Sequence, residues 1–257
     1  MKNLSFNNRA KFLTGLLFLS ALSSAHAAAE LRIIPVDHVY SPKGFDDNDS
    51  DAQVVVTGNL PSFCYKTPRA QYKIEDNTIR IQMTALYEEF PDRPCLQVQI
   101  PFLEPVKVGT LSEGTYAVKV NEEMPNSIED SIYIKKATNL STDDHMYAAV
   151  DYVERKDLVS RTINLKGYNQ SDCFELDRIE FLSNDKDTLS VKPIMKKNRN
   201  FCPLKQVPFD YEWTVPDVLP SPLVLLHVRV MTGSSINALF ANVNVGHPIH
   251  KRYRRDP

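Results

Sequence analysis

Two stretches of this chain repeat the same spacing of glycine, serine, cysteine and aromatic residues. Gly58–Tyr65 and Gly167–Phe174 both read Gly, three residues, Ser, one residue, Cys, aromatic, and Cys95 and Cys202 are each followed, after five residues, by Pro-Phe. Two shorter matches keep the same order along the chain: Val36–Val39 with Val150–Val153, and Val118–Val120 with Val228–Val230. Because four matches occur in order at nearly constant offset, the sequence predicts that a duplication produced two copies of one folding unit.

The N-terminus has the three parts of a secretory signal peptide. A basic region precedes the apolar run Phe12–Leu22, which leads to a small-residue cleavage pattern at Ser23–Ala27; its cations are Lys2, Arg9 and Lys11. Cleavage is expected after Ala27 or, alternatively, after Ala29. A membrane span needs about 20 apolar residues, roughly twice this run. The sequence therefore predicts an exported protein, periplasmic or secreted, with no transmembrane segment in its mature chain.

All four cysteines lie beyond the signal peptide, and an even number in an exported protein indicates disulfides. Four cysteines allow three pairings, and the repeat selects the one in which each unit closes its own bridge. The expected disulfides are Cys64–Cys95 and Cys173–Cys202. Each should stabilise the fold by about 3–4 kcal/mol through the unfolded state. No Cys-x-x-Cys pair is present, which disfavours a zinc or redox site.

Short runs of β-branched and aromatic residues, bounded by turn residues, predict about seven strands in each unit. In the run that begins at Thr78, the side chains of Ile79, Ile81 and Met83 share one face of a strand. This pattern is typical of a β-sandwich. The expected strands are Leu31–Val39, Gln53–Leu60, Tyr65–Ile74, Thr78–Ala85, Leu96–Phe102, Thr115–Val120 and Ser131–Ile134, then Tyr147–Val153, Val159–Leu165, Phe174–Leu182, Thr188–Ile194, Val207–Val215, Leu223–Met231 and Ile236–Val245.

Leu111–Asn121 has Gly-Thr-Tyr after a turn, followed by a Val-x-Val strand that ends at Asn. This segment resembles the closing hairpin of immunoglobulin-like domains in uncharacterised bacterial secreted or periplasmic proteins. The resemblance implies an all-β fold of two tandem immunoglobulin-like β-sandwich domains and implies no activity. The second unit has Pro220–Leu223 in its place. The expected organisation is a signal peptide at 1–27, β-sandwich domains at 28–136 and 145–246, and a basic tail at 247–257.

The parts that least resemble the repeat are the candidate binding surfaces, because loops diverge more readily than the scaffold that carries them. One is an acidic insertion in the first unit, with carboxylates at Asp46, Asp47, Asp49 and Asp51. A calcium loop of the EF-hand type would need glycine and glutamate at two positions that here hold other residues. A solvated surface loop is therefore the favoured interpretation.

The other two candidates are an aromatic pair and the C-terminal tail. Tyr211 and Trp213 follow the second Pro-Phe, and packing into the core is the favoured explanation for both. The tail gathers basic and imidazole side chains that suit an anionic surface or simply a solvated terminus. Its residues are His247, His250, Lys251, Arg252, Arg254 and Arg255.

Composition and motifs favour binding over catalysis. Removal of the signal peptide leaves 27 Lys and Arg against 32 Asp and Glu, a net charge of −5, which argues against nucleic-acid binding. No nucleophile elbow, free thiol or cofactor fingerprint is present. We expect a non-enzymatic binding or interaction module for an unknown macromolecular partner, a protein or envelope component, with no cofactor and no metal. The alternatives are a periplasmic assembly chaperone or protease inhibitor, and an enzyme or metal-binding protein without a recognisable motif.

Overall fold

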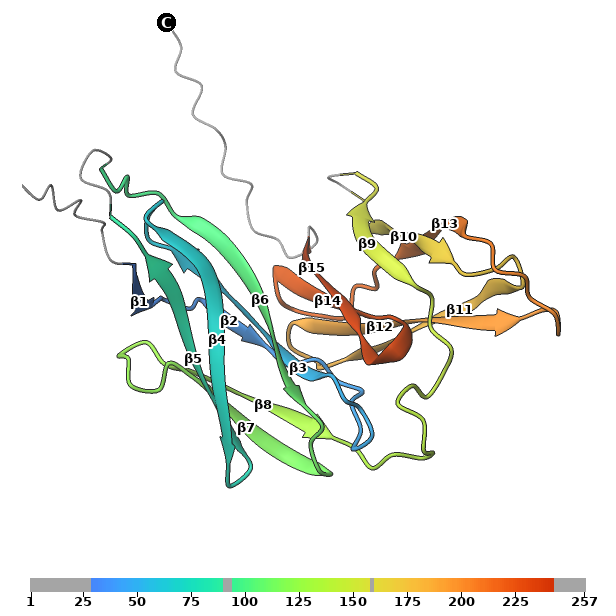
Figure 1. Ribbon diagram of the computed structural model, residues 1–257, viewed down its shortest axis with the longest axis horizontal. Helices are drawn as coiled ribbons and strands as arrows, with labels where there is room; N and C mark the ends of the chain where they lie inside the picture. Colours follow the sequence, from blue (N-terminus) through green and yellow to red (C-terminus); the bar gives the residue numbers. More distant parts are fainter. Residues whose placement is uncertain (1–28, 90–93, 158–159, 243–257) are drawn as a thin grey trace, which may run out of the picture.

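The computed structural model describes residues 29–89, 94–157 and 160–242, which form two β-sandwich units joined by a linker (Figure 1). Fifteen strands and one 3-10 turn, η1 (Met231–Gly233), make up their regular structure. The chain is therefore all-β, as predicted, with one disulfide in each half. The predicted signal peptide and the basic tail lie outside the described residues.

The first unit contains eight strands in two sheets. One sheet has the order β2-β3-β6, and the other places β4, β5, β7 and β8 in sequence, with β1 also paired to β5. The buried side chains of Ile79, Ile81 and Met83 all come from β5, as their alternation predicted. The strands are β1 (Glu30–Ile33), β2 (His38–Tyr40), β3 (Ala52–Leu60), β4 (Tyr65–Glu75), β5 (Thr78–Tyr87), β6 (Ile100–Gly109), β7 (Gly114–Val120) and β8 (Ile128–Ile134).

The second unit repeats this topology with seven strands. Its sheets have the orders β9-β10-β13 and β11-β12-β14-β15. Its one parallel pair, β12 with β14, matches the parallel pair β5 with β7, and the registers correspond residue by residue. Both units therefore share one topology, as the repeat predicts. The predicted match of Val118–Val120 with Val228–Val230 is wrong by two residues, because the register aligns Val118 with Leu226 and Val120 with Val228. The strands are β9 (Val150–Arg155), β10 (Thr162–Asn169), β11 (Phe174–Ser183), β12 (Thr188–Lys197), β13 (Val207–Thr214), β14 (Leu223–Arg229) and β15 (Ser235–Ala241).

The repeated glycine and Pro-Phe serve one packing contact in both units. A Cβ atom added to Gly58 would lie 2.7 Å from the ring of Phe102, and one added to Gly167 would lie 2.8 Å from the ring of Phe209. In each unit that atom would also come within 3.0 Å of a backbone carbonyl oxygen. Only glycine leaves room for this close approach. The glycine and the Pro-Phe of the repeat are therefore both kept because they contact each other in the core of each unit.

The disulfides are Cys64–Cys95 and Cys173–Cys202, with Cα atoms 5.5 and 5.6 Å apart, which confirms the predicted pairing. The repeated serine has the same role beside each bridge. The hydroxyl of Ser62 accepts a hydrogen bond from the amide two residues later at 3.3 Å, and Ser171 does the same at 3.3 Å. The Ser-x-Cys spacing thus fixes the turn that presents each first cysteine.

Two expected strands and one expected turn are wrong in detail. The expected strand Leu31–Val39 is divided into β1 and β2, because the chain crosses there from one sheet to the other. β6 begins at Ile100, later than expected, and continues through Pro101 and Pro105; it is an edge strand, where a missing amide costs no ladder bond. The segment 109–114 is no hairpin turn, because β6 and β7 belong to different sheets and β7 pairs with β5 and β8.

The two units pack directly against each other. All but one residue of β3 are buried, as are all residues of β14 after the first, whereas their counterparts β10 and β7 bury alternate residues. A strand with both faces buried lies between two layers of structure. Tyr40, Val55 and Leu225 form a small apolar cluster where the β2-β3-β6 sheet meets the sheet that contains β14. The domain boundary predicted between 136 and 145 stays a prediction, which limited proteolysis can test.

Candidate functional site

The acidic insertion lies in the contact between the two units, so the expectation of a solvated loop is wrong. The carboxylate of Asp49 accepts a hydrogen bond from Nη2 of Arg229 at 2.5 Å, and both side chains are at most 5% exposed. Asp46 is also buried, and Asp47 accepts a hydrogen bond from the linker amide of Ala137 at 2.7 Å. A buried guanidinium requires a carboxylate partner, and the insertion supplies one from the other unit.

An aromatic and a histidine side chain complete this contact. The ring of Phe45 packs edge-on against that of His227, with ring centroids 5.4 Å apart. His227 is fully buried and its Nδ1 lies 2.9 Å from Oδ1 of Asn237, while its Nε2 has no hydrogen-bond partner among the described residues. Burial lowers the pKa of His227 to about 4, so the ring is neutral at pH 7.

Sequence reasoning missed the residues of unit two that receive the insertion. At the edge of the same contact, Nε2 of His38 lies 2.7 Å from a carboxylate oxygen of Asp187, 149 residues away in the chain. His38 and Arg229 lie within two of the short repeat matches, but nothing in those matches indicates which residues they contact. The only signal was the insertion itself, since extra residues in one copy of a repeat mark a place where the copies differ in role.

The aromatic pair packs as the favoured interpretation predicted. Along β13 the side chains alternate between half-buried and exposed, and Tyr211 and Trp213 are on the half-buried side against the core of unit two. The six tail residues proposed for binding lie outside the described residues. The two candidate surfaces within the described residues lie apart: the insertion is in the contact between the units, and the aromatic pair is against the core of unit two. The structure also reveals a groove that the sequence did not single out.

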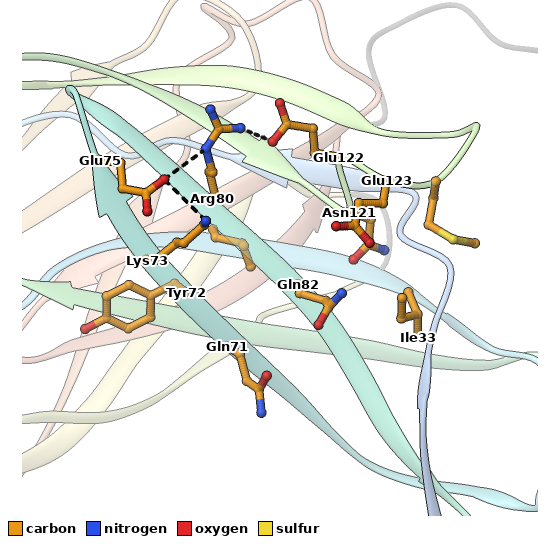
Figure 2. A pocket seen from close by; sticks show the side chains of 12 residues that line it. Ile33, Gln71, Tyr72, Lys73, Glu75, Arg80, Gln82, Asn121, Glu122 and Glu123 are labelled. Carbon is orange, nitrogen blue, oxygen red and sulfur yellow. Dashed lines mark hydrogen bonds and ion pairs between the residues drawn. The ribbon is translucent and has the colours of Figure 1, made fainter.

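The groove lies on the outer face of unit one and has a volume of about 640 Å³ (Figure 2). Strands β1, β4 and β5 and the turn after β7 form it. Gln71 lies opposite Gln82, and Lys73 opposite Arg80, in the register of β4 with β5. The lining residues are Ile33, Gln71, Tyr72, Lys73, Glu75, Arg80, Ile81, Gln82, Asn121, Glu122, Glu123 and Met124.

Ion pairs arrange the charged side of the groove. Oε2 of Glu75 lies 3.3 Å from Nζ of Lys73 and 3.7 Å from Nε of Arg80, and Arg80 also pairs with Glu122 (Figure 2). These side chains are partly exposed, so each pair contributes little to stability. The ion pairs hold both cations beside carboxylates of the same unit. The side-chain amides of Gln71 on β4 and Gln82 on β5 are left to line the groove.

Asn121 makes one end of the groove rigid. Its backbone is in the left-handed region, with φ at 52°, which asparagine tolerates better than most residues. Its Oδ1 accepts a hydrogen bond from the amide of Met83 at 2.9 Å, and its Nδ2 donates to the carbonyl of Ile34 at 2.9 Å. The turn that carries Glu122 and Glu123 is therefore fixed to β1 and β5, and its shape is preformed before any ligand arrives.

Paired amides, ion pairs and a preformed depression suit reversible binding through hydrogen bonds and charge. Within residues 29–89, 94–157 and 160–242, no group of three His, Cys, Asp or Glu side chains is placed to hold a metal ion. The same residues contain no helix long and apolar enough to cross a membrane.

Comparison with known proteins supports the β-sandwich and adds no activity. A family model described as the ORF11 beta-sandwich domain matches residues 54–129, which include β4, β5 and β7 and most of the groove. No curated protein and no solved structure matches this chain.

Proposed function

We propose that the mature chain is an exported, non-enzymatic binding protein that engages a macromolecular partner through the groove of unit one. The two disulfides suit an oxidising compartment, which agrees with the predicted signal peptide. The observation that carries the proposal is the groove: about 640 Å³, preformed, and open on a face whose counterpart in unit two serves as a docking surface. Rigid scaffolds lower the ordering cost of binding.

The buried contact between the units supports the same proposal. It joins Phe45 and Asp49 of unit one to His227 and Arg229 of unit two. Such a contact holds the two sandwiches as one body and leaves the groove of unit one as a surface with no partner within the described chain.

A groove-filling variant tests the proposal. Gln82→Trp places an indole in the groove, and Glu175→Trp places one at an exposed position of β11 in unit two as the matched control. The purified mature proteins are immobilised, and the binding of solubilised envelope fractions is measured by biolayer interferometry. We expect the Gln82 variant to lose the signal and the control to keep it, with equal thermal midpoints. Equal binding by all three proteins, or turnover of a substrate abolished by a groove mutation, would contradict the proposal.

A further inference from the structure

The groove of unit one occupies the same position in the fold as the docking surface of unit two. The registers of the two parallel pairs align Arg80 and Lys119 with Ser190 and His227. Continuing along the strands, three groove positions have counterparts in unit two: Lys73, Gln82 and Asn121 correspond to Leu182, Lys192 and Arg229. The two surfaces are copies of one site, produced by the duplication.

A polypeptide loop fills the copy in unit two. At Gly44, a Cβ atom would lie 2.9 Å from Leu182 and 3.5 Å from Lys192, so the loop backbone runs closely over both side chains. The carboxylate of Asp49 pairs with Arg229 at the far end. The loop between these two contacts thus touches the three counterparts of Lys73, Gln82 and Asn121.

From this correspondence we infer that the groove of unit one receives an extended loop of a partner protein, in the way that unit two receives residues 44–49. The inference rests on the proposed function and names the partner class. In unit two, the cationic positions Lys192 and Arg229 receive an acidic loop. In unit one, three carboxylates and two cations line the groove, and the cations already pair with Glu75 and Glu122.

The charge pattern selects a basic loop. Glu123 is exposed on the rim and forms no ion pair with any described residue. Lys119 pairs with Glu122 and Glu129, so among the described lining residues the charge of Glu123 alone has no ion partner. It is opposite in sign to that of Arg229 in the filled site of unit two. The partner loop carries a lysine or arginine that reaches Glu123, and its backbone lies over Gln82, whose amide can bond to a peptide group.

A second copy of this chain does not supply that loop. Its own insertion is already held against its own unit two by the pairing of Asp49 with Arg229. Unit two has no equivalent insertion, since residues 156–161 connect β9 to β10 where residues 41–51 connect β2 to β3. Neither of these two connections in a second copy fits the groove, and we assign the loop to a different protein.

Peptide selection tests the inference. Random twelve-residue peptides displayed on phage are first depleted of those that bind Gln82→Trp protein. The remaining phage are then selected on the mature wild-type protein. Enriched peptides are synthesised with a fluorophore, and their affinity is measured by anisotropy. We expect peptides rich in Lys or Arg that bind Gln82→Trp at least tenfold more weakly than the wild type, bind Glu123→Lys more weakly as well, and bind Glu175→Trp as well as the wild type.

Three results would overturn the inference. They are the absence of any enriched peptide that distinguishes the wild type from Gln82→Trp, enrichment of acidic peptides, and self-association of the protein that Gln82→Trp abolishes. If Gln82→Trp still removes binding of envelope material while no peptide is enriched, the groove binds a partner that is not a polypeptide. The proposed function then stands and the inference fails, so the two outcomes are distinguishable.

Discussion

At the scale of single residues, the contact between the units depends on a few buried polar groups. Asp49 and Arg229 lie 180 residues apart and are both nearly inaccessible to solvent. Neither residue was predictable as one of a pair, because an ion pair across an interface leaves no spacing in the sequence. The repeat residues Gly58 and Ser62 are the opposite case: the same packing and turn constraints act in both units, so both copies keep the same residue types.

A double-mutant cycle measures this ion pair. Asp49→Ala leaves a buried guanidinium without a partner and is expected to lower the free energy of unfolding by about 3–5 kcal/mol. The double variant Asp49→Ala, Arg229→Met should lose less than the sum of the two single variants. Urea denaturation of the mature proteins provides the values, with Glu175→Ala in the exposed pair to Lys196 as a control of much smaller effect. Additive losses would show that the two side chains do not interact.

His227 should make the stability depend on pH. Its pKa is about 4 in the folded protein and about 6.5 in the unfolded chain, so the unfolded chain takes up the proton first as the pH falls. The stabilisation is therefore fully present above about pH 6.5 and is lost as the pH falls toward 4, by about 3 kcal/mol in total. Asp187, whose pKa is lowered below its usual 3.8, loses its contribution only at still lower pH.

Denaturation at pH 7.5 and pH 4.5 checks this expectation. The wild type should lose more stability between the two values than His227→Gln, which keeps a polar side chain near Asn237 but has no titrating group. An identical loss in both proteins would assign the pH dependence to other residues.

At the scale of strands, period-two alternation predicted the half-buried strands well and the doubly buried ones poorly. β5 and β7 were recognised because polar residues alternate with apolar ones along them. β3 and β14 were recognised as strands, but nothing in the sequence showed that both of their faces are covered. The groove was missed for a related reason: its residues come from four segments, and their proximity follows from the parallel pairing of β5 with β7.

At the scale of the whole molecule, each unit has a copy of both faces that meet in the contact between the units. One copy of each face is buried in that contact. The other copy of each face is exposed and carries charged side chains. In unit one, Tyr40 and Leu103 contribute to the contact, and their counterparts in unit two are Glu154 and Asp210. Burying charged side chains at these positions would cost desolvation free energy, which disfavours head-to-tail association of separate molecules into open chains.

Charge removal tests this account of the free faces. The wild type is expected to sediment as a monomer at all concentrations used. A variant with Arg80→Ser and Lys119→His in unit one, together with Glu154→Tyr and Asp210→Leu in unit two, should associate in a concentration-dependent way. Sedimentation velocity supplies the measurement. A variant that stays monomeric while remaining folded would show that the charges are not what keeps the molecules apart.

The claim that one copy of the site is filled from within and the other awaits a partner is tested most directly by photo-crosslinking at equivalent positions. A benzoylphenylalanine residue is placed at Lys192 in one protein and at Gln82 in another, and both are irradiated in cells that export them. Peptide mass spectrometry identifies the links. We expect the label at 192 to join the peptide of the same chain that contains Gly44, and the label at 82 to join a segment of a different protein that contains Lys or Arg. Absence of the internal link at 192, or links from 82 only to the same chain or to non-protein material, would contradict the account.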